Sequence, residues 1–389
     1  TGEQAANNST AGNAGMLPRM DLNGAYVKSI GSTQQHLSSG ENVDRDNSVS
    51  DNASANVALT WTVFDGMRMF ATREKLKQFA AQGEQALKIR IENSVASVIT
   101  AYYSVVRQEQ WLRALREQIA VSTELVSISE RKLANGSGSK LDLLLVRTEL
   151  NAQRSAELTA KAEEDQAKVE LRRLLALEPI VNYTVEDTVV FGYDPSLDQL
   201  KTDAGRLNSL LLMYDRDQRI AELGLKEYRA LHLPVIDLNG AYQYSRTTNN
   251  ASFLLLNQTL GYTFGVTATL PLFNGFAVNR QVKNAKLDLL NAQLAYTRQQ
   301  QALSADVLKA HQQFQSAKAI LQLEEENIVA AREMLAIAQE RFRVGASTIV
   351  ELKAAQSAHA DATLRLVGVR YDAKLAETEL RRLAGVLVK

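Results

Sequence analysis

Cysteine is absent from this 389-residue sequence, and both histidine (four residues) and proline (five) are scarce. The absence of cysteine excludes disulfide bonds, zinc sites with thiolate ligands and thiol nucleophiles. The sequence also has no apolar run of the roughly 18 residues that a membrane-spanning helix needs. Lysine plus arginine equals aspartate plus glutamate at 44 each, so the charge balance gives no indication of a nucleic-acid partner.

Side-chain patterns that carry enzyme chemistry are missing as well. The histidines lie far apart, with no second ligand at helical spacing that would indicate a metal site: His36, His232, His311 and His359. The stretch GSGSK at 136–140 lacks the spacing of a phosphate-binding loop and follows no strand pattern. No nucleophile–base pair or paired-carboxylate motif stands out. We therefore predict a protein that is not an enzyme and has no cofactor or metal.

The sequence repeats itself once. The decapeptide LPRMDLNGAY at 17–26 returns as LPVIDLNGAY at 233–242, an offset of 216. Two later pairs keep an offset of 209, namely TVFDG at 62–66 with PLFNG at 271–275, and VELRRLLA at 169–176 with TELRRLAG at 378–385. The difference of seven residues falls between Tyr26 and about Val57, where we expect the first copy to carry a longer surface loop.

Long helices are predicted in each copy. Residues 66–134 contain no proline, and apolar residues such as Val98, Ala101, Val105 and Leu112 recur at spacings of three and four. A period near seven, held over this length, predicts paired helices with a left-handed supercoil. At a rise of 1.5 Å per residue, such a helix is roughly 100 Å long.

Each long helix stops at a glycine and a new helix begins a few residues later, in KLANGSGSKLDL at 132–143 and RFRVGASTIVEL at 341–352. The glycine can adopt the left-handed conformation that ends a helix, and a hydroxyl residue with an acid three positions later forms a capping box for the next helix. These turns predict antiparallel α-hairpins. The residues concerned are Gly136, Ser139 and Asp142 in the first copy, and Gly345, Thr348 and Glu351 in the second.

After each Leu-Pro the hydrophobic period changes to two, which predicts strands. Apolar residues share one face and small polar residues the other, and the apolar set is Leu22, Tyr26, Leu59, Trp61, Leu238, Tyr242, Val266 and Leu270. Strands of about ten residues with this alternation and aromatic ends are typical of outer-membrane β-barrels, in which the apolar face contacts lipid. A soluble sheet with one face on a core gives the same alternation. The membrane interpretation is favoured because the helices use their apolar seams for one another.

Four strands are too few for a closed barrel, which needs at least about eight in a bilayer. Closure therefore requires several copies of the chain. Three copies give a twelve-stranded barrel, and two give a narrower eight-stranded one.

These combined motifs resemble the TolC-type outer-membrane factor family, the exit ducts of Gram-negative efflux pumps and type I secretion systems. The resemblance depends on the duplicated strand–helix unit, LPxxDLNGAY, the VFDG and LFNG junctions, and RFxVGxxTIVEL at 341–352. It implies a mainly α fold with a membrane β part: a homotrimer with a twelve-stranded β-barrel in the outer membrane and a twelve-helix α-barrel in the periplasm.

The same resemblance implies partners and a gate. The helix turns at 135–142 and 345–351 correspond to the periplasmic tip, which meets an adaptor (membrane fusion) protein and an inner-membrane RND or ABC transporter. The family often has two acidic residues one helical turn apart at the pore constriction. Glu351 matches the first, whereas Ala354 occupies the second position, with Lys353 beside it. A strongly cation-selective gate is therefore not expected.

The predicted organisation has six segments. They are a remnant of an N-terminal helical or equatorial segment (1–16), the first β-hairpin of the barrel (17–65), the first long α-hairpin (66–178), an equatorial segment and helix (179–232), the second β-hairpin (233–272) and the second long α-hairpin (273–389). One continuous helix is expected over 197–232. The first copy has no equivalent of it, so we expect the natural chain to extend upstream.

A second hypothesis is a soluble periplasmic coiled-coil scaffold or adaptor that never enters a bilayer. It accounts for the long helices equally well. It predicts one α-hairpin with separate compact β domains, whereas the sequence has two α-hairpins and strands of the membrane type.

Overall fold

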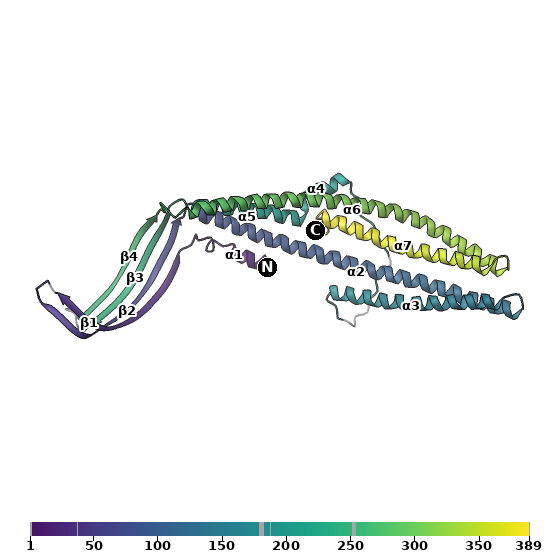
Figure 1. Ribbon diagram of the computed structural model, residues 1–389, viewed down its shortest axis with the longest axis horizontal. Helices are drawn as coiled ribbons and strands as arrows, with labels where there is room; N and C mark the ends of the chain where they lie inside the picture. Colours follow the sequence, from purple (N-terminus) through teal and green to yellow (C-terminus); the bar gives the residue numbers. More distant parts are fainter. Residues whose placement is uncertain (1, 37, 179–182, 187, 251–253, 389) are drawn as a thin grey trace. The chain divides into compact units, whose positions relative to one another are not determined.

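The computed structural model describes residues 2–36, 38–178, 183–186, 188–250 and 254–388 (Figure 1). The chain forms two compact units. The strand unit comprises Thr1–Leu87 and Met213–Thr297, and the helix unit comprises Lys88–Leu212 and Arg298–Lys389. No helix within the described residues is long and apolar enough to cross a membrane.

The strand unit contains one antiparallel sheet in the order β1-β2-β3-β4 (Figure 1). Its strands are β1 (Arg19–His36), β2 (Asn42–Phe64), β3 (Val235–Asn249) and β4 (Leu256–Thr269). The two hairpins pair in the same register, because Arg19 opposite Thr60 in the first becomes Val235 opposite Thr269 in the second. These positions differ by the sequence offsets of 216 and 209, so the two hairpins are structural repeats.

The predicted long surface loop between Tyr26 and Val57 was wrong. The additional residues lengthen the strands, which have 18 and 23 residues in the first hairpin but 15 and 14 in the second. A register shift between Gly31 and Thr33 and a left-handed Asn47 accommodate the irregularity. Strand pairing is made by backbone groups, so a polar stretch without alternation can still extend a ladder. The sequence pattern reports only the part of a strand that has an apolar face.

Four long helices form the two α-hairpins (Figure 1). They are α2 (Arg68–Ala134) with α3 (Lys140–Leu174), and α6 (Ala277–Arg343) with α7 (Ile349–Leu383). The longer member of each pair has 67 residues and the shorter has 35. The predicted seam is buried at Ala101, Val105 and Leu112 of α2 and at Val307, Ala310 and Phe314 of α6. Ala310 and Phe314 are the repeat equivalents of Ala101 and Val105.

The single helix expected over 197–232 is instead two helices, α4 (Leu197–Leu207) and α5 (Ser209–Ala230). Asn208 interrupts them with an extended ψ of 115°. Its side-chain oxygen accepts from Leu211 N at 3.0 Å, which caps α5, and its Nδ2 donates to Leu383 O at 3.0 Å, at the end of α7. Asparagine is a preferred residue at helix N-termini, so this break has a local cause. The short helix α1 (Gly2–Asn8) lies in the predicted segment 1–16.

A strap, residues 183–186 and 188–196, connects the two α-hairpins within the helix unit. Tyr183 donates to Lys168 O of α3 at 2.8 Å, and Tyr102 of α2 accepts from Glu186 N at 3.0 Å. Farther along, Gly192 N donates at 3.1 Å to Glu377 of α7. Pro179, which was predicted to begin this segment, lies outside the described residues.

Glu377 holds the second end of the strap. Its carboxylate is completely buried, and it is paired with Lys374 at 2.7 Å and Arg381 at 2.9 Å. Lys374 Nζ also donates to Val190 O at 2.6 Å. A buried carboxylate with two cationic partners and a backbone donor is fully compensated, whereas removing one partner would leave a costly unpaired charge. The strap therefore fixes the two hairpins to each other.

Two equivalent helix ends give a stability test. Ala176 follows α3 with a left-handed φ of 52°, and its repeat equivalent Gly385 follows α7 with a φ of 71°. Gly385 also packs against Leu207, because a Cβ added to Gly385 would lie 2.4 Å from Leu207 O. Ala176→Gly should raise the free energy of unfolding by about 0.5–1 kcal/mol, because it relieves a left-handed alanine. Gly385→Ala should lower it by more than about 2 kcal/mol through strain and overlap.

The measurement is the temperature at which the detergent-solubilised protein loses its helical circular dichroism. Shifts of the same sign in the two variants would show that these helix ends are not equivalent in conformation.

Candidate functional site at the helix tips

Both α-hairpins turn through the same backbone motif. Gly136 and Gly345 adopt left-handed φ values of 72° and 79°. In each turn the glycine N–H and the following N–H return to the last carbonyls of the helix, in the pattern of a Schellman motif. The bonds are Gly136 N to Leu133 O (3.1 Å), Ser137 N to Lys132 O (2.9 Å), Gly345 N to Phe342 O (3.1 Å) and Ala346 N to Arg341 O (2.8 Å).

The helices that follow are capped by hydroxyl groups. Ser139 Oγ accepts from Leu141 N at 3.1 Å, and Thr348 Oγ1 accepts from Glu351 N at 3.2 Å. Asp142 and Glu351 lie in the first turns, where they face the positive helix ends. Within the described chain, neither carboxylate hydrogen-bonds to the backbone of its cap. Only the hydroxyl half of each predicted capping box is therefore formed.

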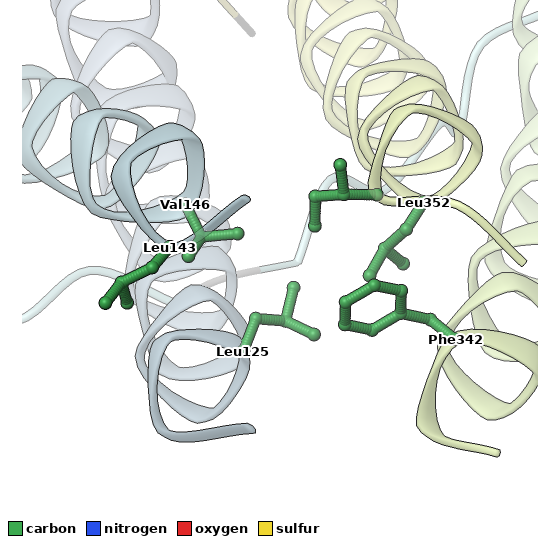
Figure 2. Packing of buried hydrophobic residues seen from close by; sticks show 6 residues of the cluster. Leu125, Leu143, Val146, Phe342 and Leu352 are labelled. Atoms are coloured by element: carbon green, nitrogen blue, oxygen red, sulfur yellow. The ribbon is translucent and has the colours of Figure 1, made fainter. Parts of the chain in front are cut away.

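An apolar cluster joins the two tips, and we call it the tip cluster. Its buried members are Leu125, Leu143 and Val146 of the first hairpin, and Phe342, Ile349 and Leu352 of the second. Figure 2 shows Leu125, Phe342 and Leu352 converging from the two hairpins. Leu352 has no exposed surface. Burying a side chain of this size stabilises by about 1.5–3 kcal/mol, so this cluster stabilises the packing of the two tips.

Two cationic links reinforce the cluster. Lys132 Nζ donates to Phe342 O at 2.7 Å and lies 4.1 Å from the centre of the Phe342 ring, at the negative end of α6. Lys353 of α7 lies 3.0 Å from Glu149 of α3. Their side chains are 53% and 32% exposed, so this ion pair contributes less than about 1 kcal/mol.

Sequence reasoning noted Lys353 but missed Lys132 and Glu149. Their partners are distant in sequence and show no helical spacing, so no local signal identifies them. Glu351 has a local partner, since Arg341 Nη2 lies 4.0 Å from its carboxylate.

A polar cavity of roughly 370 Å³ lies between the two hairpins of the helix unit, with walls from α2, α3, α6 and α7. Its lining includes Gln118, Gln153, Arg332, Lys353 and His359. Gln118 Nε2 and Gln153 Oε1 are buried without a partner among the described residues. A cavity with unpaired amides suits water better than an apolar ligand. The contact between the hairpins is thus apolar at the tip cluster and polar at this cavity.

Seven of the eight predicted lipid-facing residues lie on one face of the sheet, and Leu270 directly follows the end of β4. The register brings Leu22 opposite Val57, Val57 opposite Tyr242, and Leu238 opposite Val266. On the outer strands these side chains are strongly exposed, as at Leu22 (78%), Tyr26 (67%) and Val266 (69%). Leu270, Trp61 and Tyr242 are also exposed, whereas Leu59 and Leu238 are half-buried. An apolar face of this extent, left exposed within its unit, marks an interaction surface.

The outer membrane efflux protein family matches residues 3–177 and 215–386 of this chain. The chain belongs to this family. CyaE of Bordetella pertussis is 25% identical over 372 residues, which cover 95% of this chain and 77% of that protein. TolC of Escherichia coli K12 is 22% identical over 385 residues, covering 96% and 75% respectively. The solved outer-membrane channel OprN shares the fold with a TM-score of 0.80 at 17% identity, covering 99% of this chain and 85% of that one.

The predicted family, location and transport role are therefore confirmed. The protein is an outer-membrane exit duct for efflux or secretion, in a family of transport channels rather than enzymes. The alternative of a soluble periplasmic scaffold is set aside by this membership. The fold is mostly helical with one sheet, as expected for a TolC-like channel.

His359 in the cavity wall provides a test by pH. Burial lowers its pKa below the ordinary value near 6.5, and the charge of Arg332 lowers the pKa further, partly offset by Glu117. The unfolded chain therefore takes up this proton first as the pH falls. The stability associated with neutral His359 is complete above about pH 6.5 and is lost as the pH drops toward the lowered pKa of the folded state.

Thermal unfolding from pH 8 to pH 5 should thus show a smaller loss of melting temperature in His359→Gln than in the wild type. His232→Gln, at an exposed histidine, is the control and should follow the wild type. Parallel curves for all three proteins would show that His359 does not contribute to the pH dependence.

Proposed function

We propose that the protein is one subunit of a passive homotrimeric channel, with a twelve-stranded barrel in the outer membrane and a gate at its helix tips. The observation that carries this proposal is the four-stranded sheet, which has one exposed apolar face and a strand at each edge with only one partner strand. In a bilayer, unpaired backbone groups at such edges are too costly to persist, so the sheet must close into a barrel with other copies.

The copy number follows from the need for an open lumen. Two copies would give eight strands, and a barrel of about eight strands has an interior that side chains largely fill. Three copies give twelve strands, which leaves room for a passage. The same three copies bring together twelve long helices, each α-hairpin contributing two, and these form the tube that crosses the periplasm.

The gate is assigned to the helix turns. Gly136, Ser139 and Asp142 in one hairpin, and Gly345, Thr348 and Glu351 in the other, form the tips that meet the adaptor protein and an inner-membrane RND or ABC transporter. Opening separates the hairpins, which disrupts the tip cluster and the pair of Lys353 with Glu149. Ala354 stands where the family often has a second acid, and Lys353 lies beside it, so the gate has a weaker preference for cations.

A charge swap tests the role of the ion pair in gating. Lys353→Glu places two carboxylates together and should favour separated tips. A pair worth about 0.5–1 kcal/mol changes the ratio of open to closed channels by about twofold to fivefold. Single-channel recording in planar bilayers should therefore show a higher open probability for Lys353→Glu. In the double variant that adds Glu149→Lys, the open probability should return toward the wild-type value.

The matched control is Glu157→Lys. Glu157 pairs with Arg116 at 3.0 Å and has similar exposure, but both residues belong to the first hairpin. It should leave the open probability unchanged. An equal response in this variant, or no recovery in the double swap, would show that the pair of Lys353 and Glu149 does not hold the gate closed.

Charge reversal of the tip acids tests their place in the pore. Asp142→Lys and Glu351→Lys should each change conductance or adaptor binding, because both carboxylates lie in the first turn after the tip. Glu351→Gln removes charge without reversing it and should give a smaller change. If conductance and export stayed at wild-type values in both reversals, these acids would have no role in the gate.

A further inference from the structure

The outer edges of β1 and β4 are the two strand edges without a partner in the sheet of the described chain. We propose that β4 of one subunit pairs antiparallel with β1 of the next copy in one defined register, with Val266 opposite Tyr26 of the partner subunit. This inference rests on the proposed oligomeric barrel and adds the residue-level arrangement of its seam. Three observations on the strand unit support it.

The first observation is the exact agreement of the repeats. The residue pairs of the first hairpin recur in the second when 216 is added to the β1 position and 209 to the β2 position. For example, Met20 opposite Leu59 becomes Ile236 opposite Ala268. The join between repeats within one chain is the pairing of β2 with β3, which places Val57 opposite Tyr242. In a closed ring of identical repeats, β4 of one chain therefore pairs with β1 of the next in the same way as β2 pairs with β3.

Applying the offsets to the β2–β3 ladder gives the register between chains. Position 57 becomes 266 and position 242 becomes 26. The same shift converts Leu59 with Gly240 into Ala268 with Gly24, and Trp61 with Leu238 into Leu270 with Leu22. On the other face it converts Ala58 with Ala241 into Thr267 with Ala25.

The second observation is that this register aligns the two faces of the sheet. The exposed apolar residues Val266 and Leu270 fall opposite Tyr26 and Leu22, which are exposed on β1. The hydroxyl residues Thr263 and Thr269 fall opposite Ser29 and Asn23. A slip of one residue would turn every side chain of one strand to the opposite face, so that apolar residues would meet polar ones. The match of the two faces therefore excludes a register shifted by one residue.

The third observation concerns the junctions between strand and helix. A Cβ added to Gly66 would lie 2.7 Å from Leu233 Cβ and 2.6 Å from Ala230 O, so the first repeat packs closely on the Leu-Pro of the second. Gly275, the equivalent of Gly66, has no described atom within 4 Å of the same position. Leu17, the equivalent of Leu233, is 60% exposed. Leu17 of the partner subunit, placed at Gly275, gives the second junction the contact that the first makes within a chain.

Cysteine crosslinking tests the register directly, because the 389-residue sequence contains no cysteine. Ala25→Cys with Thr267→Cys is oxidised in outer-membrane vesicles with copper phenanthroline. It is compared with two pairs shifted by two residues on the same face, Asn23→Cys with Thr267→Cys and Val27→Cys with Thr267→Cys. Directly opposed Cβ atoms lie about 4.5–5.5 Å apart, whereas diagonal neighbours lie about 7–8 Å apart, too far for an unstrained disulfide.

A matched control exists within the chain. Ala58→Cys with Ala241→Cys occupies the equivalent position of the β2–β3 join, and its disulfide joins two strands of one chain. Opposed pairs alternate between hydrogen-bonded and closer non-hydrogen-bonded types. A second double variant, Gly24→Cys with Ala268→Cys, therefore tests a pair of the opposite hydrogen-bonding type. Its control within one chain is Gly240→Cys with Leu59→Cys.

The expected result is crosslinking between subunits at the proposed pairs at a rate close to that of their controls, and about tenfold faster than at either shifted pair. Faster coupling at a shifted pair overturns the register. If the control disulfides form but no crosslink forms between subunits, the proposed pairing of β4 with β1 of the next chain is wrong.

The number of chains in the largest covalent species reports separately on the proposed trimer. If the proposed pairs crosslink selectively but the largest covalent species does not contain three chains, the register is supported and the copy number of three is contradicted. Channel conductance, measured without crosslinking, tests the transport role independently of both.

Discussion

A backbone N–H or C=O without a partner costs several kcal/mol in hydrocarbon, and the outer edges of β1 and β4 present rows of such groups. The rest of the structure is arranged around this constraint. The chain supplies two hairpins that are joined in register but cannot close on themselves. The exposed apolar face of the sheet supports the proposed closure in lipid with further copies of the same chain.

Duplication provides the geometry that repeated closure requires. The two hairpins share one register, and the two α-hairpins share helix lengths of 67 and 35 residues. Where the repeats differ, the difference is local. The strands of the first hairpin, for example, have 18 and 23 residues, whereas those of the second have 15 and 14. The strap joins the two α-hairpins through different contacts at its two ends, with Tyr183 donating to Lys168 O of α3 and Gly192 N donating to Glu377 of α7.

The helix unit has two kinds of contact between its hairpins. At the tips, Leu352 and Phe342 pack with Leu125 in a dry cluster, and the pair of Lys353 with Glu149 adds a small electrostatic term. At the other end the buried Glu377 network holds the strap firmly. The strap is held on the second hairpin by Glu377 and Lys374 of α7, and on the first hairpin by Tyr102 and by Lys168 O. In the proposed gate, the strap keeps the two hairpins connected while the tips separate.

Periodicity in the sequence was sufficient to predict the strands and the long helices, because the seam position of Val105 and the shared face of Leu22 and Tyr26 follow from spacing alone. The length of the first hairpin was not predictable in this way, since its added residues pair through the backbone without an apolar face. Asn208 is a cap that periodicity overlooks in an otherwise helical stretch. Lys132 and Glu149 were missed because their partners come from the other repeat, and only the folded chain brings them together.

The copy number of the particle decides whether the sheet closes with strands of other chains. Native mass spectrometry of the detergent-solubilised protein, with lipid and detergent removed in the gas phase, gives the number of 42.9 kDa chains per particle. The account predicts three chains and no stable monomer in a membrane-mimetic detergent. A monodisperse single chain that keeps its sheet intact in detergent would contradict it, because four strands would then be stable with both edges open.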